Sequence, residues 1–169
     1  MDKHGKYIQY FVEGEDEEKM LSVLKTDMQL IVPGKVSKLN VVQDKLTKAR
    51  LMNLRPDTTV VLVFDTDTSS TNILKENIKI LKKTPAVQSI ICITQVKNLE
   101  DELIRSCDIK AIRELTGSKT DTEYKRDLIK AYNLAALLKK HGFDINKFWV
   151  KDAVGVFGEF KNESRLIKK

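Results

Sequence analysis

The feature that most constrains the fold is an uninterrupted apolar run, Val60 to Phe64, in the first half of the chain. Five consecutive apolar residues without polar alternation are typical of a strand that is buried on both faces, as in a parallel sheet covered by helices. We therefore expect residues 60–64 to form the central strand of an α/β sheet.

The segments around this run alternate between strand and helix patterns. Strands are expected at 7–12 and 89–96, with short extended pieces at 30–32 and 39–42. Apolar spacing, caps and terminating Gly or Pro residues predict helices at 16–25, 44–54, 71–83, 98–104, 109–115 and 122–141. Residues 148–150 and 154–157 are expected as edge strands or packing turns, and 161–169 as a frayed, charged tail. Repeated crossovers of this kind predict an α/β fold with a mostly parallel sheet and helices on both faces.

Length and composition narrow the class of protein. The chain has 169 residues, 41% hydrophobic and 32% charged, which fits one globular domain. No apolar run approaches the ~20 residues needed to cross a bilayer, and residues 1–6 lack the apolar core of a signal peptide. We therefore expect a cytoplasmic protein without membrane contact, in which Cys92 and Cys107 are buried, reduced thiols.

Acidic residues follow two of the predicted strands. Glu13 comes directly after the strand at 7–12, and Asp65 and Asp67 come directly after the central run. The carboxyl ends of parallel strands meet at one edge of a sheet, where open α/β folds place their chemistry. Carboxylates gathered there repel one another unless a cation or shared proton holds them, and oxygen ligands suit Mg²⁺ or Mn²⁺. The pattern predicts metal-assisted chemistry on phosphate.

The charge of the chain is compatible with a polyanionic substrate. Its net charge is +6 and its pI is near 9.2, although acidic residues gather at the predicted site. An excess of Lys and Arg outside the predicted site would attract nucleic acid. The same excess is also typical of a soluble protein whose surface is simply basic.

The motif Val12-Glu13-Gly14, with Glu17 three residues after the glycine and an apolar strand ending in Asp65-Thr66-Asp67, resembles the Toprim domain. This domain occurs in bacterial primases, topoisomerases, small RNA-maturing nucleases and nucleases of the overcoming-lysogenization-defect (OLD) family. The resemblance covers about the first hundred residues. It implies a single Toprim-like, Rossmann-like domain with about four parallel strands, with residues 1–115 as the catalytic core and 116–169 as a helical extension packed on it.

The resemblance also implies roles for particular residues. Glu13 would correspond to the general acid/base or metal-ligating glutamate, and Asp65 and Asp67 to the metal-binding pair, while Glu17 would supply a further carboxylate. The neighbouring residues Glu15, Asp16 and Glu18 are expected only to stabilise a helix N-terminus. OLD-like nucleases use one more acidic residue and a lysine downstream. We expect Glu100, with Glu102 as second choice, and Lys151 in preference to Lys161.

These observations favour a Mg²⁺- or Mn²⁺-dependent nuclease, with RNA slightly preferred over DNA. By analogy with the family it would act in RNA maturation or prokaryotic defence, beside a separate ATPase partner. A haloacid-dehalogenase-type phosphatase with Asp65 as nucleophile is one alternative, which gives Glu13 no role. A non-catalytic subunit that binds nucleic acid or an ATPase is another.

Overall fold

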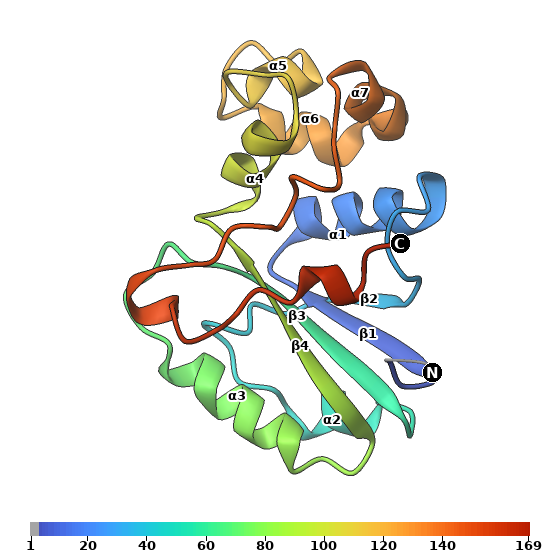
Figure 1. Cartoon of the computed structure of the whole chain (residues 1–169), viewed down its shortest axis with the longest axis vertical. Coiled ribbons are helices and arrows are strands. Elements are labelled where there is room, and N and C mark those ends of the chain that lie inside the picture. The colour runs from blue at the N-terminus through green and yellow to red at the C-terminus, as the bar shows by residue number, and fades with distance from the viewer. Residues whose placement is uncertain (1–3) are drawn as a thin grey trace.

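The computed structural model describes residues 4–169 and contains an all-parallel, four-stranded sheet in the order β2-β1-β3-β4 (Figure 1). The strands are β1 (Tyr7–Val12), β2 (Lys35–Lys38), β3 (Thr58–Asp65) and β4 (Val87–Gln95). The predicted α/β fold is confirmed, and the apolar run at 60–64 lies inside the sheet, with β1 on one side and β4 on the other.

Helices cover both faces of this sheet, as expected. In Figure 1, α1 (Glu15–Ser22) and the group α4 (Leu99–Ser106), α5 (Arg113–Thr116), α6 (Tyr124–Lys130) and α7 (Leu134–Lys140) lie above it. Below it lie α2 (Lys48–Met52) and α3 (Asn72–Lys82). Within residues 4–169, no helix is long and apolar enough to cross a membrane.

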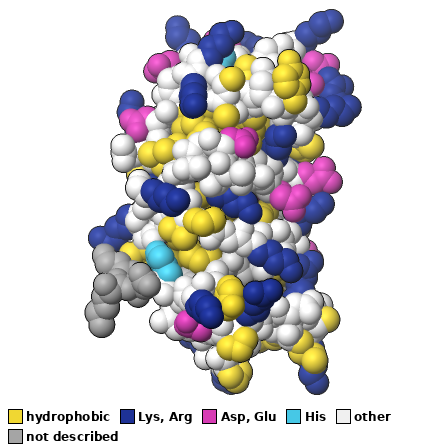
Figure 2. Space-filling model, turned by 90° about the vertical axis from the view of Figure 1, so that its right-hand side faces the viewer, with side chains coloured by type: hydrophobic (Ala, Val, Ile, Leu, Met, Phe, Trp, Pro, Cys, Tyr) yellow, Lys and Arg dark blue, Asp and Glu magenta, His cyan; other side chains and the backbone are white. Residues whose placement is uncertain are grey.

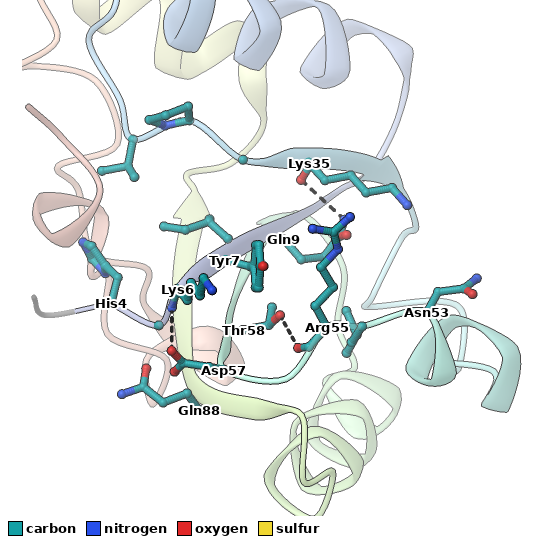
Figure 3. Close-up of a pocket in the computed structure, with 16 residues that line it drawn as sticks. His4, Lys6, Tyr7, Gln9, Lys35, Asn53, Arg55, Asp57, Thr58 and Gln88 are labelled. Atoms are coloured by element: carbon teal, nitrogen blue, oxygen red, sulfur yellow. Dashed lines mark hydrogen bonds between the residues drawn. The ribbon is translucent and has the colours of Figure 1, made fainter.

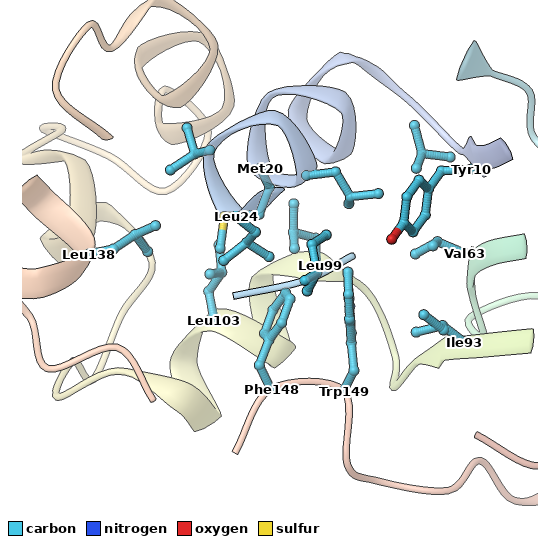
Figure 4. Close-up of a cluster of buried hydrophobic side chains, with 14 of the residues drawn as sticks. Tyr10, Met20, Leu24, Val63, Ile93, Leu99, Leu103, Leu138, Phe148 and Trp149 are labelled. Carbon is cyan, nitrogen blue, oxygen red and sulfur yellow. The ribbon is translucent and has the colours of Figure 1, made fainter. Parts of the chain in front are cut away.

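Alternate residues of the strands build two separate cores. Val61 and Val63 of β3 pack in the core below α1 and α4, which Figure 4 shows together with Tyr10, Leu99 and Trp149. The intervening residues Val60, Leu62 and Phe64 face the opposite core, which includes Leu74 and Leu81 of α3. This division follows from the two-residue period of a strand. It also separates Cys107 from Cys92, and both are buried free thiols, as predicted.

Several predicted element bounds are wrong. The pieces at 30–32 and 39–42 are not strands of the sheet, whose edge strand is the polar segment Lys35–Lys38 between them. The helix predicted at 44–54 is reduced to α2, which begins after Thr47, whose hydroxyl caps it by accepting a hydrogen bond from Arg50 N. The helix predicted at 122–141 is divided into α6 and α7, because residue 131 is extended.

The C-terminal segment is held firmly against the sheet. Trp149 is fully buried in the core, and residues 155–157 form a 3₁₀ turn rather than a strand. The tail predicted to fray is bound, because Ile167 is fully buried and its carbonyl accepts a hydrogen bond of 2.8 Å from Val32 N. This return of the chain brings the indole of Trp149 within hydrogen-bond distance of Gln95, the last residue of β4.

Candidate active site at the carboxyl edge of the sheet

The ends of β1 and β3 bring Glu13 and Asp65 together. The two strands are hydrogen-bonded neighbours, and the Glu13 Oε2 atom accepts a hydrogen bond of 3.4 Å from the backbone N–H of Asp65. Both residues line a cavity of about 230 Å³, together with Asp67 on the exposed loop after β3. The remaining lining residues are Asn40, Val42, Gln43 and Thr68. The structure therefore gathers three of the predicted site residues around one hollow.

Glu17 approaches the same cluster from the first turn of α1. Its Oε2 accepts a hydrogen bond of 3.1 Å from Gly14 N, and only 4% of the residue is exposed. A Cβ at position 14 would lie 3.2 Å from Asp16 Oδ1 and 3.4 Å from Glu17 Oε2. Gly14 therefore leaves room for two carboxylates beside the backbone that links β1 to α1.

Gln95, the last residue of β4, ties this cluster to the core. It is fully buried and pairs with Asp65 in the register of the sheet. Its Nε2 donates to Asp65 Oδ1 at 2.7 Å and to Glu17 Oε1 at 3.4 Å. Its Oε1 accepts from Trp149 Nε1 at 3.2 Å. Because an indole N–H only donates, the Gln95 oxygen must face Trp149 and the amide donors must face the carboxylates.

Trp149 is itself fixed in an uncommon backbone conformation. Its φ angle is 57°, in the left-handed region that bulky residues rarely adopt. Its N–H donates to Glu102 Oε1 at 3.3 Å, and its carbonyl accepts from Ser164 Oγ at 2.5 Å. The hydrogen bonds of Asp65 thus continue through Gln95 and Trp149 to the buried residues Glu102 and Ser164.

Burial and mutual repulsion raise the pKa values of the cluster. Burial, followed by repulsion from Glu13, raises the pKa of Asp65 to about 8, against the hydrogen bond from Gln95. Burial, followed by the neighbouring Asp16, raises the pKa of Glu17 to about 9. Burial also raises the pKa of Glu13, while the hydrogen bond from Asp65 opposes that shift. Within residues 4–169, none of these three carboxylates forms an ion pair.

A second group of charges lies beside the cluster, on α1, α4 and α6. Asp16 is 2% exposed and lies 3.7 Å from Lys125 Nζ, and it is the main reason that the pKa of Lys125 is raised. Burial, followed by the charge of Glu100, raises the pKa of Tyr124. The charge of Glu100 also contributes to the raised pKa of Lys125. Glu100 is not among the residues that line the 230 Å³ cavity, so its part in metal binding stays a prediction.

The other downstream candidates have identifiable surroundings. Glu102 is fully buried and accepts hydrogen bonds from Val96 N at 2.9 Å and from Trp149 N, and it pairs with Arg105 at 3.0 Å. Its oxygens are therefore engaged in the fold. Lys151 is exposed on the segment after Trp149, and its carbonyl accepts a hydrogen bond from Thr94 Oγ1. Lys161 is exposed as well, and the choice between the two lysines stays a prediction.

Gln95 is a site-related residue that sequence reasoning missed, and Trp149 was expected within an edge strand or packing turn at 148–150. The usable signal for Gln95 was its position, since it is a polar residue at the end of an apolar strand next to the one that ends in Asp65. No comparable signal marks Asn40 or Gln43, because they follow the edge strand β2, whose position was predicted wrongly.

The donor atoms of this site suit a hydrated divalent ion. In the described part of the chain, no three His, Cys, Asp or Glu side chains are arranged as a ready metal-binding group. Mg²⁺ does not require one, because it retains several waters and is commonly bound through one or two carboxylates and substrate phosphates. The half-buried pair Glu13 and Asp65, whose pKa values are both raised, is an oxygen donor set of this kind.

The fold and the site define an α/β protein with a half-buried carboxylate cluster at the carboxyl ends of its parallel strands. No family model, curated protein or solved structure matches the chain. Function is therefore inferred from the chemistry of the site.

Proposed function

We propose that the chain is a divalent-metal-dependent nuclease of the Toprim type, which hydrolyses phosphodiester bonds in nucleic acid. The observation that supports this most is the pairing of Glu13 with Asp65, two carboxylates with raised pKa values beside a cavity that Asp67 also lines. Such a group is stable in its charged form only when a cation compensates it, and a phosphodiester substrate brings further negative charge that also needs one.

Each residue of the cluster has a distinct task in this proposal. Asp65, held by the Gln95 amide, and Glu13 would bind Mg²⁺ or Mn²⁺, with Asp67 contributing from the cavity rim. When bound, the metal would lower the pKa of an attacking water and neutralise charge on the phosphate. Burial raises the pKa of Glu13, as is common for groups that transfer protons in active sites, so it would also serve as general acid or base. Glu17 would hold a proton or bind a second ion.

The surface supports a polyanionic substrate. Lys and Arg side chains are spread over the whole face shown in Figure 2, in keeping with the net charge of +6. Positive charge of this kind raises the rate and strength of nucleic-acid binding without selecting a sequence. We favour RNA slightly over DNA and propose a cytoplasmic protein that acts in RNA maturation or prokaryotic defence, with a separate ATPase as partner.

A cleavage assay with matched variants tests the proposal. The purified chain is incubated with labelled single-stranded RNA and DNA in Mg²⁺, in Mn²⁺ and in EDTA. We expect cleavage only with the metals, and its loss in Glu13→Gln and in Asp65→Asn. Glu18→Gln, on the same first turn of α1 but outside the cavity lining, should retain activity. The first two variants should fold, because each puts an uncharged amide of similar shape in place of a partly buried carboxyl group whose pKa is raised.

A second measurement does not depend on finding the right substrate. Mn²⁺ that binds the native cluster should raise the unfolding temperature of the wild type, by an amount that grows with metal concentration. Asp65→Asn should abolish the rise and Glu18→Gln should not. If Mn²⁺ leaves the wild type unchanged, the metal site is wrong. Release of phosphate from small esters without cleavage of RNA or DNA would favour the phosphatase, and metal binding without either activity would favour the regulatory subunit.

A further inference from the structure

A cavity of about 1230 Å³ lies at the amino-terminal edge of the sheet, opposite the carboxylate cluster. Its walls are the start of β1, the chain leading into β2, and the loop between α2 and β3 (Figure 3). Two glycines let these loops approach closely, because a Cβ at Gly5 would lie 2.4 Å from Asp57 O and one at Gly34 would lie 2.6 Å from Ile8 O. The cavity shares no residue with the lining of the proposed active site.

The charged groups of this cavity are mainly cationic. Lys6, Lys35 and Arg55 line it, against one carboxylate, Asp57. The Asp57 Oδ2 atom accepts a hydrogen bond of 2.9 Å from the backbone N–H of Lys6, so a neutral donor already engages it. Among residues 4–169, none of the three cations forms an ion pair. The cavity therefore offers uncompensated positive charge to an anion.

An aromatic ring holds two of these cations in place. Arg55 lies 4.9 Å and Lys6 5.6 Å from the centre of the Tyr7 ring, within the range of cation–π contacts. Figure 3 shows the Arg55 side chain running beside Tyr7 toward Gln9 and Lys35. A cation–π contact positions a guanidinium without neutralising its charge, so its N–H groups stay available for the oxygens of a phosphate.

His4 adds an imidazole ring to the wall of the same cavity. Its Nδ1 atom is buried from solvent and has no hydrogen-bond partner within the described residues, so a ligand in the open cavity would meet the rest of the ring rather than this nitrogen. The ring therefore reports on occupancy of the cavity and is not counted among the groups that bind phosphate.

We propose that this cavity binds the phosphate groups of a nucleotide, either free or as part of a nucleic-acid strand. Its cations suit phosphate, and its volume is that of a pocket for a whole small ligand rather than for one ion. Asn53 and Gln88 add amide groups to the walls, which suit hydrogen bonds to a base. The site is separate from the proposed nuclease centre and does not depend on its activity.

Binding measured in EDTA tests this site without interference from metal or cleavage. ATP, inorganic phosphate and a labelled RNA of about ten nucleotides are titrated into the wild type at fixed ionic strength. Lys35→Gln/Arg55→Gln removes two cavity cations, and Lys139→Gln/Lys140→Gln removes two exposed charges from the end of α7. The second variant controls for net charge. Lys35→Gln alone, at an exposed side chain, is the variant to use if the first one unfolds.

We expect ATP to bind more tightly than phosphate, and the cavity variant to weaken ATP binding by about tenfold or more, since each lost contact is a charge-assisted hydrogen bond. The α7 variant should change it by less than about twofold. Addition of ATP should also shift the imidazole NMR signals of His4. If only RNA binding shows this dependence on Lys35 and Arg55, the ligand is a strand, and the proposal stands. Equal losses in both double variants, phosphate binding as tight as that of both ATP and RNA, His4 signals that neither ATP nor RNA moves, or no binding of any probe would each overturn it.

Discussion

Gln95 is the residue on which the geometry of the proposed active site most depends. It lies between Trp149, which can only donate a hydrogen bond, and Asp65, which accepts one. An amide satisfies both needs, and the sheet register places it opposite Asp65. Sequence reasoning found the carboxylates because acidic residues after apolar runs are conspicuous. It missed Gln95 because the need for an amide arises only when Trp149 folds back from a segment 54 residues away.

Replacing Gln95 with Leu should destabilise the protein by about 1–3 kcal/mol, because the Trp149 N–H loses its acceptor in a fully buried position. Gln88→Leu on the same strand is the control. Gln88 is exposed, so its replacement should cost less than about 0.5 kcal/mol. Urea unfolding of both variants measures the difference. Similar values for the two would show that the contact with Trp149 contributes nothing to stability.

The raised pKa values make a second residue-scale prediction, on pH. Asp65 keeps its proton up to about pH 8 in the native state and releases it near pH 4 when unfolded. The native state therefore binds more protons across this window, and its free energy of unfolding should fall as the pH rises through it. Glu17, with its pKa of about 9, should act in the same direction.

The difference between wild type and Asp65→Asn isolates this effect from other titrations. In EDTA, the stability of the wild type should decline more steeply from about pH 5 to about pH 8 than that of the variant. Asp67→Asn, on the exposed loop, should keep the steep decline. Thermal unfolding at several pH values measures both slopes. Parallel slopes for wild type and Asp65→Asn would mean that Asp65 is ionised throughout.

Elements with strong local signals were predicted best. The central strand, α3, and the start of α4 at Asn98 follow from apolar patterns and caps that act within a few residues. The edge strand β2 was misplaced because Lys35–Lys38 is held by backbone pairing with β1 and contains one apolar residue. The split between α6 and α7 has no local breaker, since Gly and Pro are absent from residues 124–140. It arises from packing. Helix α6 packs on α1, whereas α7 packs on the π-helical turn at Val23–Asp27 that directly follows α1.

The cap of α4 gives a prediction at the scale of an element. Asn98 Oδ1 accepts a hydrogen bond of 2.9 Å from Asp101 N, whereas Asn133, at the start of α7, makes no such bond. Asn98→Ala should therefore destabilise the protein by about 1 kcal/mol. Asn133→Ala should cost less than about 0.5 kcal/mol. Chemical denaturation of the pair decides, and a larger effect at Asn133 would contradict the assignment of the cap.

At the scale of the whole molecule, one rigid sheet separates two sites of opposite charge. Strand β1 connects the two sites. Tyr7, its first residue, lines the cationic cavity, and Glu13 directly follows its last residue. The acidic site could be predicted because its residues end adjacent strands. The cationic cavity could not, because Lys6, Lys35 and Arg55 belong to three different segments whose loops meet only in the folded chain. The composition gives the net charge of the chain, but it does not indicate that an acidic and a cationic site lie at opposite edges of the sheet.

The positive charge of the molecule predicts how nucleic-acid binding depends on salt. Each phosphate that a Lys or Arg neutralises releases condensed counterions, so affinity for single strands should fall with a logarithmic slope of about −0.7 per contact. Three contacts then weaken binding by roughly 20-fold between about 50 and about 200 mM salt. Titrations of labelled RNA in EDTA measure this slope, and Lys35→Gln/Arg55→Gln should reduce its magnitude if the cationic cavity grips the strand. An affinity for RNA that ignores salt would contradict electrostatic binding, and with it the use of the net charge of +6 as support for a nucleic-acid substrate.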